Sequence, residues 1–527
     1  MNSNLNSPSS AAEPSPYFTV RFARFLGRRI RGLWRFVFSR RMVWTLAIFA
    51  SLLVLLYQYE NWNGARELAE ARKKLIERIG TDHYLDLVPE EVPEAENFYA
   101  IDEIKSWRVP SAGAAGGFSY PLPADRLFPE GFDPPALVEE AGTQHLDLAG
   151  WVEKRAASGK PFAVGESPAA LLFRELGDGD GILARLVAGL ERPKSQIIPC
   201  RRVLLAAEDG MPFKAKYHAI SGVINFQNRM ALHLMAAALA NDRQRTLEVA
   251  DIMFRLAEGV VADTTLVASI SGLYQNSITL NAMNPVLQCA SLTDADFRQI
   301  QQWLGKTNDL ENAERGFNAE VGSNFQAYHF LKGQSMTKGG WDVGPALGAS
   351  PGSLMAVFNR IAPANWMDAN FAFALESIMM LRGKGGEESW REARDARRDV
   401  AQQVEAASYL FSAGPIRMPN PRRWFGCIAV PETSGIWEKA AANLFRRRCA
   451  ILTCALHRHR LAHGGFPEEL AGLDATFLPE PMKDPAKAEA FLNYRKTRQG
   501  FWLWSVGEDR ADDGGDAGKD WIWRHEK

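Results

Sequence analysis

One apolar run without any charge, from Met42 to Tyr57, constrains this chain more than any other feature. An α-helix rises about 1.5 Å per residue, so the run and its edge at residues 58–59 reach roughly 27 Å. That length is close to the thickness of the hydrocarbon core of a bilayer. We therefore expect a helix that crosses a membrane once, near the N-terminus of the chain.

The charges on the two sides of the run predict its direction. Eight arginines lie between Arg21 and Arg41, whereas Glu60, Glu67 and Glu70 follow the run. Cationic segments stay on the cytoplasmic side of a bacterial membrane. We expect a single-pass protein of the bacterial inner membrane, with inner-membrane lipid as a partner, a cytoplasmic N-terminus and the bulk of the chain in the periplasm.

The region before the run leaves alternatives open. The segment from Ser39 to Trp44 resembles a twin-arginine export signal. No small-x-small cleavage site follows the apolar run, which favours an uncleaved signal-anchor. Residues 17–41 either lie as a basic amphipathic helix on the inner leaflet or serve only as the positive flank of the anchor.

The rest of the chain predicts a mainly α fold: an N-terminal transmembrane helix, a large helical-hairpin domain and a small C-terminal α+β module. The predicted segments are a cytoplasmic basic arm (1–41), the transmembrane helix (42–59), a helical stalk and extended segment (60–108), a Pro- and Gly-rich linker (109–135), the helical domain (136–431), and a helix plus antiparallel β module (432–527). The stalk helix is expected to end at Gly80, because glycine accepts the backbone conformation of a helix C-terminus.

Local signals within residues 136–431 are those of helices. Ser167-Pro168 and Ser350-Pro351 each combine a capping residue with a first-turn proline, and Thr293 with Asp296 has the spacing of a capping box. Two apolar segments around residues 241–242 outline an α-hairpin. No fixed repeat period is present, so a solenoid-like stack and an irregular helical domain both stay open.

Composition excludes some partners and motifs. The formal net charge is -1, which gives no general attraction to nucleic acid, and no nucleic-acid partner is expected. The five cysteines are an odd number and widely spaced, unlike a disulfide framework. No phosphate-binding glycine loop is present.

The last hundred residues have a different pattern. A helix is expected from about Ser434 to His463, ending at Gly464-Gly465, and a β-hairpin around Gln499-Gly500. The elements that follow the helix in order are Gly464-Gly465-Phe466-Pro467, Asp484-Pro485, Asn493-Tyr494, Trp504-Ser505-Val506-Gly507 and Asp512-Asp513-Gly514-Gly515.

This succession, from about Ser434 to Trp523, resembles the C-terminal half of type II secretion major pseudopilins. In that family a helix is followed by an Asp-Pro turn and a short antiparallel sheet around a calcium-binding loop. The whole layout, with its anchor, its Val92–Tyr99 stretch and its helical middle, also resembles a set of uncharacterised bacterial single-pass membrane proteins. That second resemblance implies an architecture and no activity.

The acidic loop from Glu508 to Asp516 places carboxylates between glycines, and calcium prefers several oxygen ligands on a flexible turn. The pseudopilin resemblance implies a structural calcium ion held there. Its ligands would be drawn from Asp509, Asp512, Asp513 and Asp516. A solvated acidic turn without an ion is the alternative.

Two other groups have a functional and a plain structural interpretation. His459 and His463 are four residues apart, as in helical zinc sites, or they form a polar helix end. The triplet Arg446–Arg448 either pairs with acidic groups of a neighbouring domain or forms a solvated face.

Taken together, the sequence favours a non-enzymatic, membrane-anchored scaffold or docking protein on the exported side, with envelope proteins as partners. An exported hydrolase with a site in the helical domain is one alternative, and an accessory of a secretion or pilus-like machine is another. A deep pocket with convergent carboxylates or histidines would favour the enzyme. A broad groove with exposed aromatic residues would favour docking.

Overall fold

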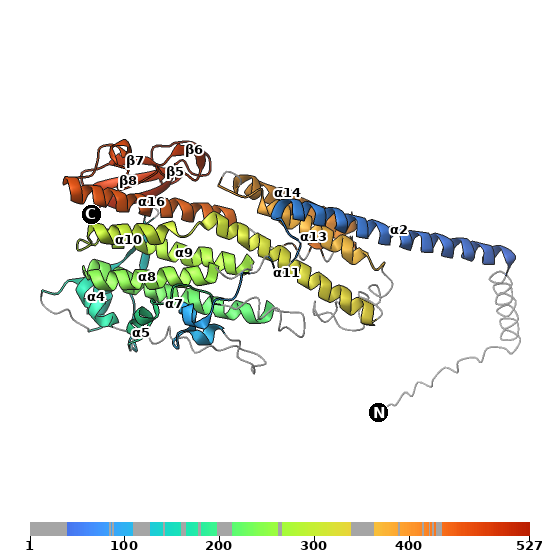
Figure 1. The fold of residues 1–527 in the computed structure, drawn as a ribbon, viewed down its shortest axis with the longest axis horizontal. Helices are drawn as coiled ribbons and strands as arrows, with labels where there is room; N and C mark the ends of the chain where they lie inside the picture. The colour runs from blue at the N-terminus through green and yellow to red at the C-terminus, as the bar shows by residue number, and fades with distance from the viewer. Residues whose placement is uncertain are drawn as a thin grey trace, which may run out of the picture.

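Helices dominate the order of elements along the chain (Figure 1). The computed structural model describes residues 39–83, 86, 89–108, 127–140, 143–159, 165–177, 181–197, 213–261, 266–338, 363–387, 390–413, 416–420, 422–423, 426–427, 430 and 435–526. The predicted arm up to residue 38, most of the linker (109–126), the Ser350-Pro351 cap and Cys200 lie outside these residues.

The helices are α2 (Arg40–Ile79), α3 (Leu148–Ala157), α4 (Pro168–Leu176), α5 (Ile182–Gly189), α7 (Phe213–Leu239), α8 (Arg243–Val261), α9 (Leu266–Leu287), α10 (Asp294–Gly305), α11 (Asp309–Lys338), α13 (Trp366–Arg382), α14 (Trp390–Ser408) and α16 (Ile436–His463). Short 3-10 helices are η2 (Glu94–Glu96), η3 (Phe98–Ala100), η4 (Lys105–Arg108) and η6 (Leu470–Gly472). The strands are β1 (Leu137–Glu140), β2 (Thr143–Leu146), β3 (Tyr409–Ala413), β4 (Ile416–Pro419), β5 (Lys483–Asp484), β6 (Lys487–Phe491), β7 (Asn493–Lys496), β8 (Gly500–Ser505) and β9 (Trp521–Glu526). The prediction of a mainly α fold is confirmed.

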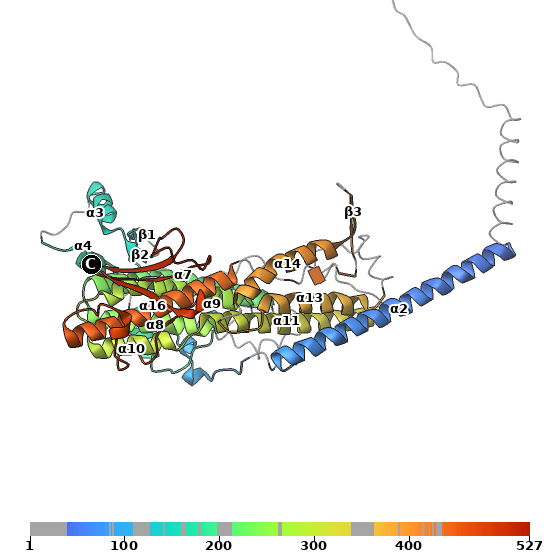
Figure 2. The ribbon, with the colours of Figure 1, turned by 90° about the horizontal axis from the view of Figure 1, so that it is seen from above.

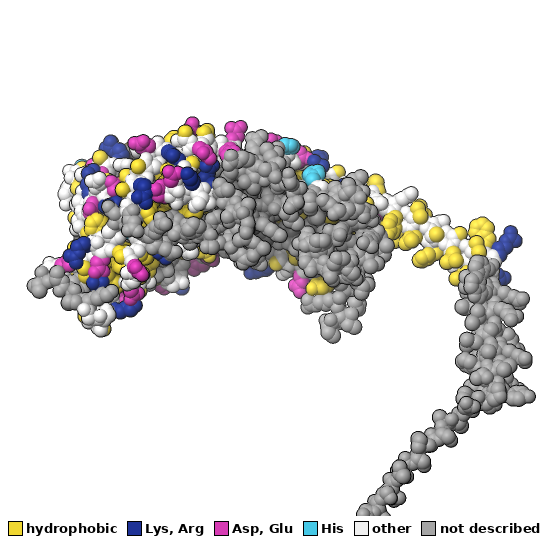
Figure 3. Space-filling model, turned by 90° about the horizontal axis from the view of Figure 1, so that it is seen from below, with side chains coloured by type: hydrophobic (Ala, Val, Ile, Leu, Met, Phe, Trp, Pro, Cys, Tyr) yellow, Lys and Arg dark blue, Asp and Glu magenta, His cyan; other side chains and the backbone are white. Residues whose placement is uncertain are grey.

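Helix α2 joins the predicted transmembrane helix and the predicted stalk helix in one piece. Ser39 caps its start by accepting a hydrogen bond from the Met42 backbone N–H at 3.2 Å, and Gly80 ends it with a φ of 91°. Within the described part of the chain, α2 is the one helix long and apolar enough to cross a membrane. Figure 3 shows its apolar side chains uncovered where the helix leaves the body, and Trp44 and Phe49 are 64% and 65% exposed.

The second half of α2 packs along α13 (Figure 2). Gly64, Leu68, Ala71 and Leu75 recur every three or four residues and are buried, so they form one packed stripe. A side chain at Gly64 would place its Cβ only 2.0 Å from the Asn365 carbonyl oxygen. The two helices therefore approach each other at a point where only glycine fits.

Polar contacts fix this approach. The Asn365 backbone N–H donates to Asn61 Oδ1 at 3.1 Å, and Asn365 Nδ2 donates to the Asn61 carbonyl at 2.8 Å. Trp366 Nε1 donates to Glu60 Oε2 at 2.8 Å. Arg422 Nη2 also pairs with Glu67 Oε1 at 2.5 Å. The exposed first half of α2 thus continues directly into the half that packs on α13, with no linker between them.

Helix α9 occupies the centre of the body, in contact with α7, α8, α11 and α16. Most of its residues are buried, on every side of the helix, including Gln275, Asn276 and Thr279. A helix that is buried all round has no single apolar face. Two apolar clusters fill the body, and both α9 and α16 contribute side chains to each cluster.

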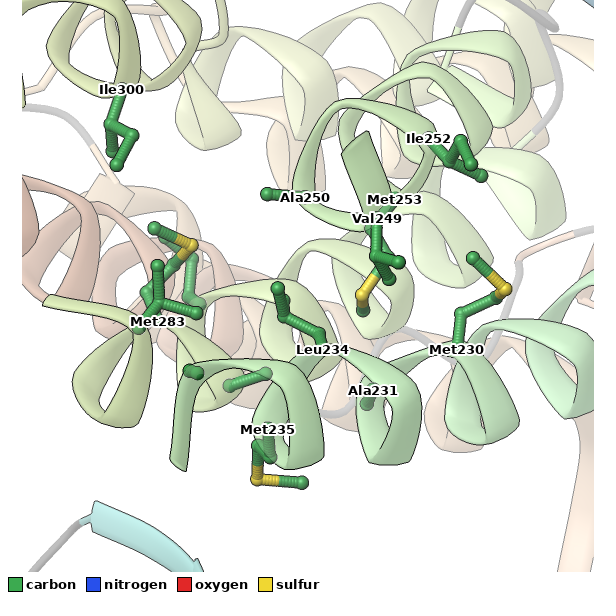
Figure 4. Packing of buried hydrophobic residues seen from close by; sticks show 14 of the residues in the cluster. Met230, Ala231, Leu234, Met235, Val249, Ala250, Ile252, Met253, Met283 and Ile300 are labelled. Carbon is green, nitrogen blue, oxygen red and sulfur yellow. The ribbon is translucent and has the colours of Figure 1, made fainter. Parts of the chain in front are cut away.

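The α7–α8 hairpin predicted around residues 241–242 is present. Asn241 has a φ of 57°, which is the left-handed conformation of a tight turn. Met230, Leu234 and Met253 pack between the two helices, and Met283 of α9 lies beside them (Figure 4). Two of the three predicted caps are also confirmed, and in the first of them Ser167 and Pro168 open α4. Thr293 and Asp296 close a capping box at the start of α10.

Buried polar side chains tie α9 to its neighbours. Gln227 Nε2 of α7 donates to the Gln275 carbonyl at 3.2 Å and to Thr279 Oγ1 at 2.7 Å. On the other side, Asn443 Nδ2 of α16 donates to the Leu273 carbonyl at 2.7 Å. A buried amide that lost its partner would be costly, so these bonds set the register of the helices.

The strongest such contact is a buried ion pair between α11 and α16. Arg447 Nε lies 2.9 Å from Asp309 Oδ2, and their side chains are only 3% and 0% exposed. Asn276 of α9 donates to the other Asp309 oxygen at 2.8 Å, and the Leu304 carbonyl accepts from Arg447 Nη1 at 3.2 Å. Three helices and the end of α10 therefore meet at this pair.

The C-terminal segment forms a helix followed by small antiparallel sheets. Helix α16 ends at Gly464, which has a φ of 81°, and β7, β8 and β9 form a three-stranded sheet. His525 of β9 lies 2.7 Å from His457 of α16 between their Nε2 atoms and 3.0 Å from Asn284 Oδ1 of α9. The predicted helix end and hairpin are confirmed, while the likeness to pseudopilins stays a prediction.

Two hairpins within residues 136–431 were not predicted. Strands β1 and β2 pair antiparallel, as do β3 and β4. Each strand has only four or five residues, too short for the alternation of apolar and polar residues that identifies a strand in a sequence.

We predict that Arg447→Met destabilises the chain by about 3 to 5 kcal/mol, because it leaves the buried Asp309 carboxylate without its cation. Urea unfolding of the full chain in detergent micelles, followed by tryptophan fluorescence, measures the change. Arg66→Met is the matched control, since the Arg66–Glu70 pair is more than half exposed, and it should cost less than about 1 kcal/mol. Equal effects of the two substitutions would contradict the role given to the buried pair.

Gly64→Val should destabilise the packing of α2 on α13 by about 1 to 3 kcal/mol, because the added side chain clashes with the Asn365 backbone. The same unfolding experiment measures it, and Ala65→Val on the exposed side of α2 is the control. A wild-type unfolding curve for Gly64→Val would show that the two helices do not approach as closely as described.

Candidate functional site

A groove of about 660 Å³ opens on the body between α9, α16, α7 and β1. Its apolar lining consists of Leu137, Ile270, Leu273, Ile278 and Ile436. Its polar lining consists of Asn228, Tyr274, Ser277, Asn281, Lys439 and Arg446. This volume is in the range of pockets that bind ligands in proteins.

The groove follows the one open side of the central helix. Ile270, Tyr274, Ser277 and Asn281 recur at three- and four-residue spacing, which places them on one face of α9. Tyr274 is 49% exposed, although the residues on either side of it are buried. An exposed aromatic ring on an otherwise covered helix is a feature of binding surfaces.

The groove is cationic. Lys439 Nζ lies 3.2 Å from the centre of the Tyr274 ring, a cation–π contact that holds the ammonium group over the open face of α9. Arg446 lies two turns further along α16 and also lines the groove. None of the described lining residues is an aspartate, glutamate, histidine or cysteine. The described lining therefore offers positive charge, amides and hydroxyl groups.

The predicted calcium loop forms a series of local turns. Asp509 Oδ1 accepts from the Ala511 N–H, and Asp516 Oδ1 accepts from the Gly518 N–H, each at 3.0 Å. Asp513 Oδ1 accepts from Lys519 Nζ at 2.9 Å. Over the residues that the structure describes, no group of three or more His, Cys, Asp or Glu side chains is arranged to hold a metal ion. Calcium binding by this loop stays a prediction.

Asp512 and Asp520 connect the loop to the sheet beneath it. Asp512 Oδ1 accepts from Trp504 Nε1 at 2.9 Å, and Asp520 Oδ2 accepts from the Gly515 N–H at 2.8 Å. Asp520 is only 4% exposed, and the sequence analysis did not single it out. Its position at the start of β9 was not evident from the sequence, because the loop that precedes the strand is long.

The arginine triplet is engaged in pairs, so the interpretation as ion-pairing residues is confirmed for two of its members. Arg447 pairs with Asp309, and Arg448 Nη2 lies 2.5 Å from Glu387 Oε1. Arg446 lines the groove. The His459 and His463 rings are tilted by 42° with their centres 4.5 Å apart, and His459 Nδ1 lies 3.0 Å from the Gly465 carbonyl oxygen.

One further titratable cluster lies at the start of α13. Lys332 Nζ lies 2.8 Å from Asp368 Oδ1 and donates to the Tyr328 hydroxyl, which in turn donates to Asp368 at 2.8 Å. Burial and the adjacent Asp368 carboxylate raise the pKa of Tyr328. Tyr328 and Asp368 are both buried while Lys332 is 39% exposed, and the three groups satisfy one another.

Glu320 of α11 is a separate, half-buried acid beside the start of α9. Burial raises the pKa of the Glu320 carboxyl to about 7, although Asn324 and the Leu266 backbone N–H both donate to it. Neither Glu320 nor the Tyr328 cluster lines the groove. The described residues therefore do not bring a shifted acid to this groove.

Comparison of the chain with family profiles, with curated proteins and with solved structures returns no match.

The residues of the groove were not identified from the sequence. They come from four elements, at positions near 137, 228, 270–281 and 436–446. The sequence of α9 contained one signal for the groove. Polar residues and an aromatic residue are interspersed with apolar ones along the whole helix.

We predict that Glu320→Gln is more stable than the wild type at pH 8, by about 1 to 3 kcal/mol. The pKa of the Glu320 carboxyl is raised from 4.5 to about 7 in the folded chain. Below pH 4.5 the carboxyl is protonated in both the folded and the unfolded chain, so it does not destabilise the fold. As the pH rises from 4.5 to 7 the carboxyl ionises in the unfolded chain first, and the free energy of unfolding falls. The advantage of the variant should therefore disappear near pH 4.

Urea unfolding at pH 4, 6 and 8 measures this dependence, with Glu405→Gln on the exposed side of α14 as the control. A stability difference between Glu320→Gln and the wild type that does not change with pH would contradict the assignment.

Proposed function

We propose that this protein is a membrane-anchored docking protein of the bacterial inner membrane. Helix α2 anchors it, and the groove on α9 and α16 receives a partner in the periplasm. The observation that carries the proposal is the chemistry of the groove. It combines an exposed aromatic ring with cations, amides and apolar side chains, and its described lining contains no carboxylate, histidine or cysteine. An exported hydrolase that uses a carboxylate, histidine or cysteine would need such side chains to converge in this site.

The proposed anchoring is supported by the residues at both ends of the apolar part of α2. Trp44 and Trp62 are exposed and 18 residues apart, which corresponds to about 27 Å of helix. Tryptophans at that separation match the two interfaces of a bilayer. The arginines before the run and the glutamates after it support a periplasmic body.

The packing of α2 supports a fixed display of the groove. Glu60, Asn61 and Gly64 already contact the start of α13, within a turn of Trp62. Helix α13 is 17 residues long, about 25 Å, and Trp437 Nε1 at the start of α16 donates to the Leu381 carbonyl at its far end. The groove would thus face partners that reach some 25 Å beyond the membrane surface.

Photo-crosslinking in intact cells tests the proposal. With p-benzoylphenylalanine in place of Tyr274 or of Asn228, we expect one discrete crosslinked product, because both positions line the groove. The same probe in place of Phe491, which is 57% exposed on β6, should not give it. Ile278→Trp, which fills the groove, should abolish the product.

Two outcomes would contradict docking at this site. One is the absence of any product from both groove positions, and the other is the same product from Phe491. Mass spectrometry of the product identifies the partner. A pseudopilin or a secretin would give the protein the more specific role of an accessory of a secretion machine.

A further inference from the structure

We infer that mild acid loosens the C-terminal sheet from helices α9 and α16, through a buried pair of histidines. His457 of α16 and His525 of β9 bring their Nε2 atoms within 2.7 Å of each other, and the two residues are only 2% and 4% exposed. This inference stands apart from the groove and from the proposed docking function. It draws on the hydrogen bonds of the pair, on the side chains around it and on its place beside β9.

The hydrogen bonds around the pair determine where its protons lie. Asn284 Nδ2 of α9 donates to the Arg524 carbonyl at 3.1 Å, so Asn284 Oδ1 is the acceptor that faces His525 Nδ1 at 3.0 Å. His525 therefore carries a proton on Nδ1, and in its neutral form its Nε2 has a lone pair. That lone pair accepts the Nε2–H of His457.

The contact between the two rings limits how many protons the folded pair can hold. A hydrogen bond between imidazoles needs one N–H and one lone pair. The neutral pair can take up one proton and keep the bond, whereas a second proton would make both Nε2 atoms donors and place two like charges in contact. In the unfolded chain each histidine takes up its own proton at about pH 6.5. Below that pH the unfolded chain therefore binds more protons than the folded chain, and stability falls as the pH falls.

Aromatic side chains enclose the pair. Phe297 of α10 stacks on the His457 ring with the ring centres 4.9 Å apart, and Phe466 meets the same ring edge-on at 5.5 Å. Phe501 of β8 stacks on the His525 ring, again with the centres 4.9 Å apart. Two imidazolium charges in this setting would be removed from water, which is costly.

The charged groups of α16 and α10 do not favour protonation of the pair. Arg460 follows His457 by three residues, on the same face of α16, and its positive charge opposes the uptake of further protons. Arg458 pairs with Asp294 of α10 at 2.8 Å, so the charge of this acid is balanced. His459 lies two residues after His457 and therefore on the opposite side of the helix.

The groups on the other elements point away from the pair or have partners of their own. Arg524 and Glu526 flank His525 along β9, so they point to the opposite face of the sheet. Lys496 of β7 pairs with Glu468, which follows α16, at 2.7 Å. Helix α9 and strand β8 contain no charged side chain.

The pair lies where β9 meets the helices. Next to it, Gln288 Nε2 of α9 donates to the Glu526 carbonyl at 3.3 Å. At the other end of the strand, Trp521 stacks with Trp390, a contact that does not titrate. Acid should therefore loosen β9 from its end at residues 524–526, while the region of Trp521 stays in place.

Hydrogen exchange of the full chain in nanodiscs of zwitterionic lipid tests the inference. Protection factors of the β9 amides, corrected for the intrinsic exchange rate at each pH, are compared at pH 7.5, 6 and 5. We expect the protection at residues 522–526 to fall about tenfold per pH unit below pH 6, which corresponds to a difference of one bound proton. The protection of α13 should stay within about threefold of its value at pH 7.5.

Removal of the titrating rings provides the matched variants. In His457→Gln/His525→Gln, amides that do not titrate replace the imidazoles, so the protection of β9 at pH 5 should equal that at pH 7.5. His145→Gln, which changes an exposed histidine on β2, should keep the wild-type response to acid.

Equal protection of β9 at pH 7.5 and pH 5 in the wild type would overturn the inference, and so would a wild-type acid response in the double variant. If the double variant does not fold, exchange at the imidazole C2 position of the wild-type histidines decides. A lower protonation midpoint for His457 or His525 than for His145 would support the inference, and equal midpoints would overturn it.

Discussion

The structure depends on a central helix that is covered on almost every side. Buried polar groups of α9 are hydrogen-bonded to the helices around it. Gln227 of α7 donates to the Thr279 hydroxyl, Asn443 of α16 donates to the Leu273 backbone carbonyl, and Asp309 of α11 accepts from the Asn276 side chain. Those bonds fix where the neighbouring helices can lie. The face that they leave open is the one that carries Tyr274, and it becomes the groove.

The same arrangement connects the groove to the membrane helix through packed elements. Helix α9 contacts α11, α11 contacts α13, and α13 contacts α2. The ion pair between Arg447 and Asp309 holds α16 to α11, so both walls of the groove belong to this series. At its other end, Gly64 lets α2 and α13 touch backbone to backbone. A chain built in this way holds the groove at a set distance and orientation from α2.

Sequence patterns predicted what is decided locally. The caps at Ser167 and at Thr293, and the helix ends at Gly80 and Gly464, depend on a few neighbouring residues, and the structure has them where they were expected. The stalk helix expected up to Gly80 is present, and α2 runs through residue 60 without a break. A change from lipid-facing to water-facing composition alters what a helix contacts, and it does not by itself end the helix.

The groove depends on contacts that no local pattern contains. The groove is lined by residues from distant parts of the sequence, and they meet only after the helices pack. They include Leu137, Asn228, Tyr274 and Lys439. The short hairpins β1–β2 and β3–β4 were missed for a related reason, since strands of four or five residues carry little periodic signal. The arginine triplet shows the same limit, because the sequence could not identify Asp309 as the partner of Arg447.

Hydrogen exchange of the full chain in lipid nanodiscs, measured by mass spectrometry, tests most directly whether the anchor and the groove belong to one rigid body. Amides that open only when the body unfolds exchange slowly and together. The account predicts that residues 60–79 of α2 exchange as slowly as α13 and α9. Exchange of residues 60–79 that is orders of magnitude faster than that of α13 would mean that α2 is a loose tether, and it would contradict the account.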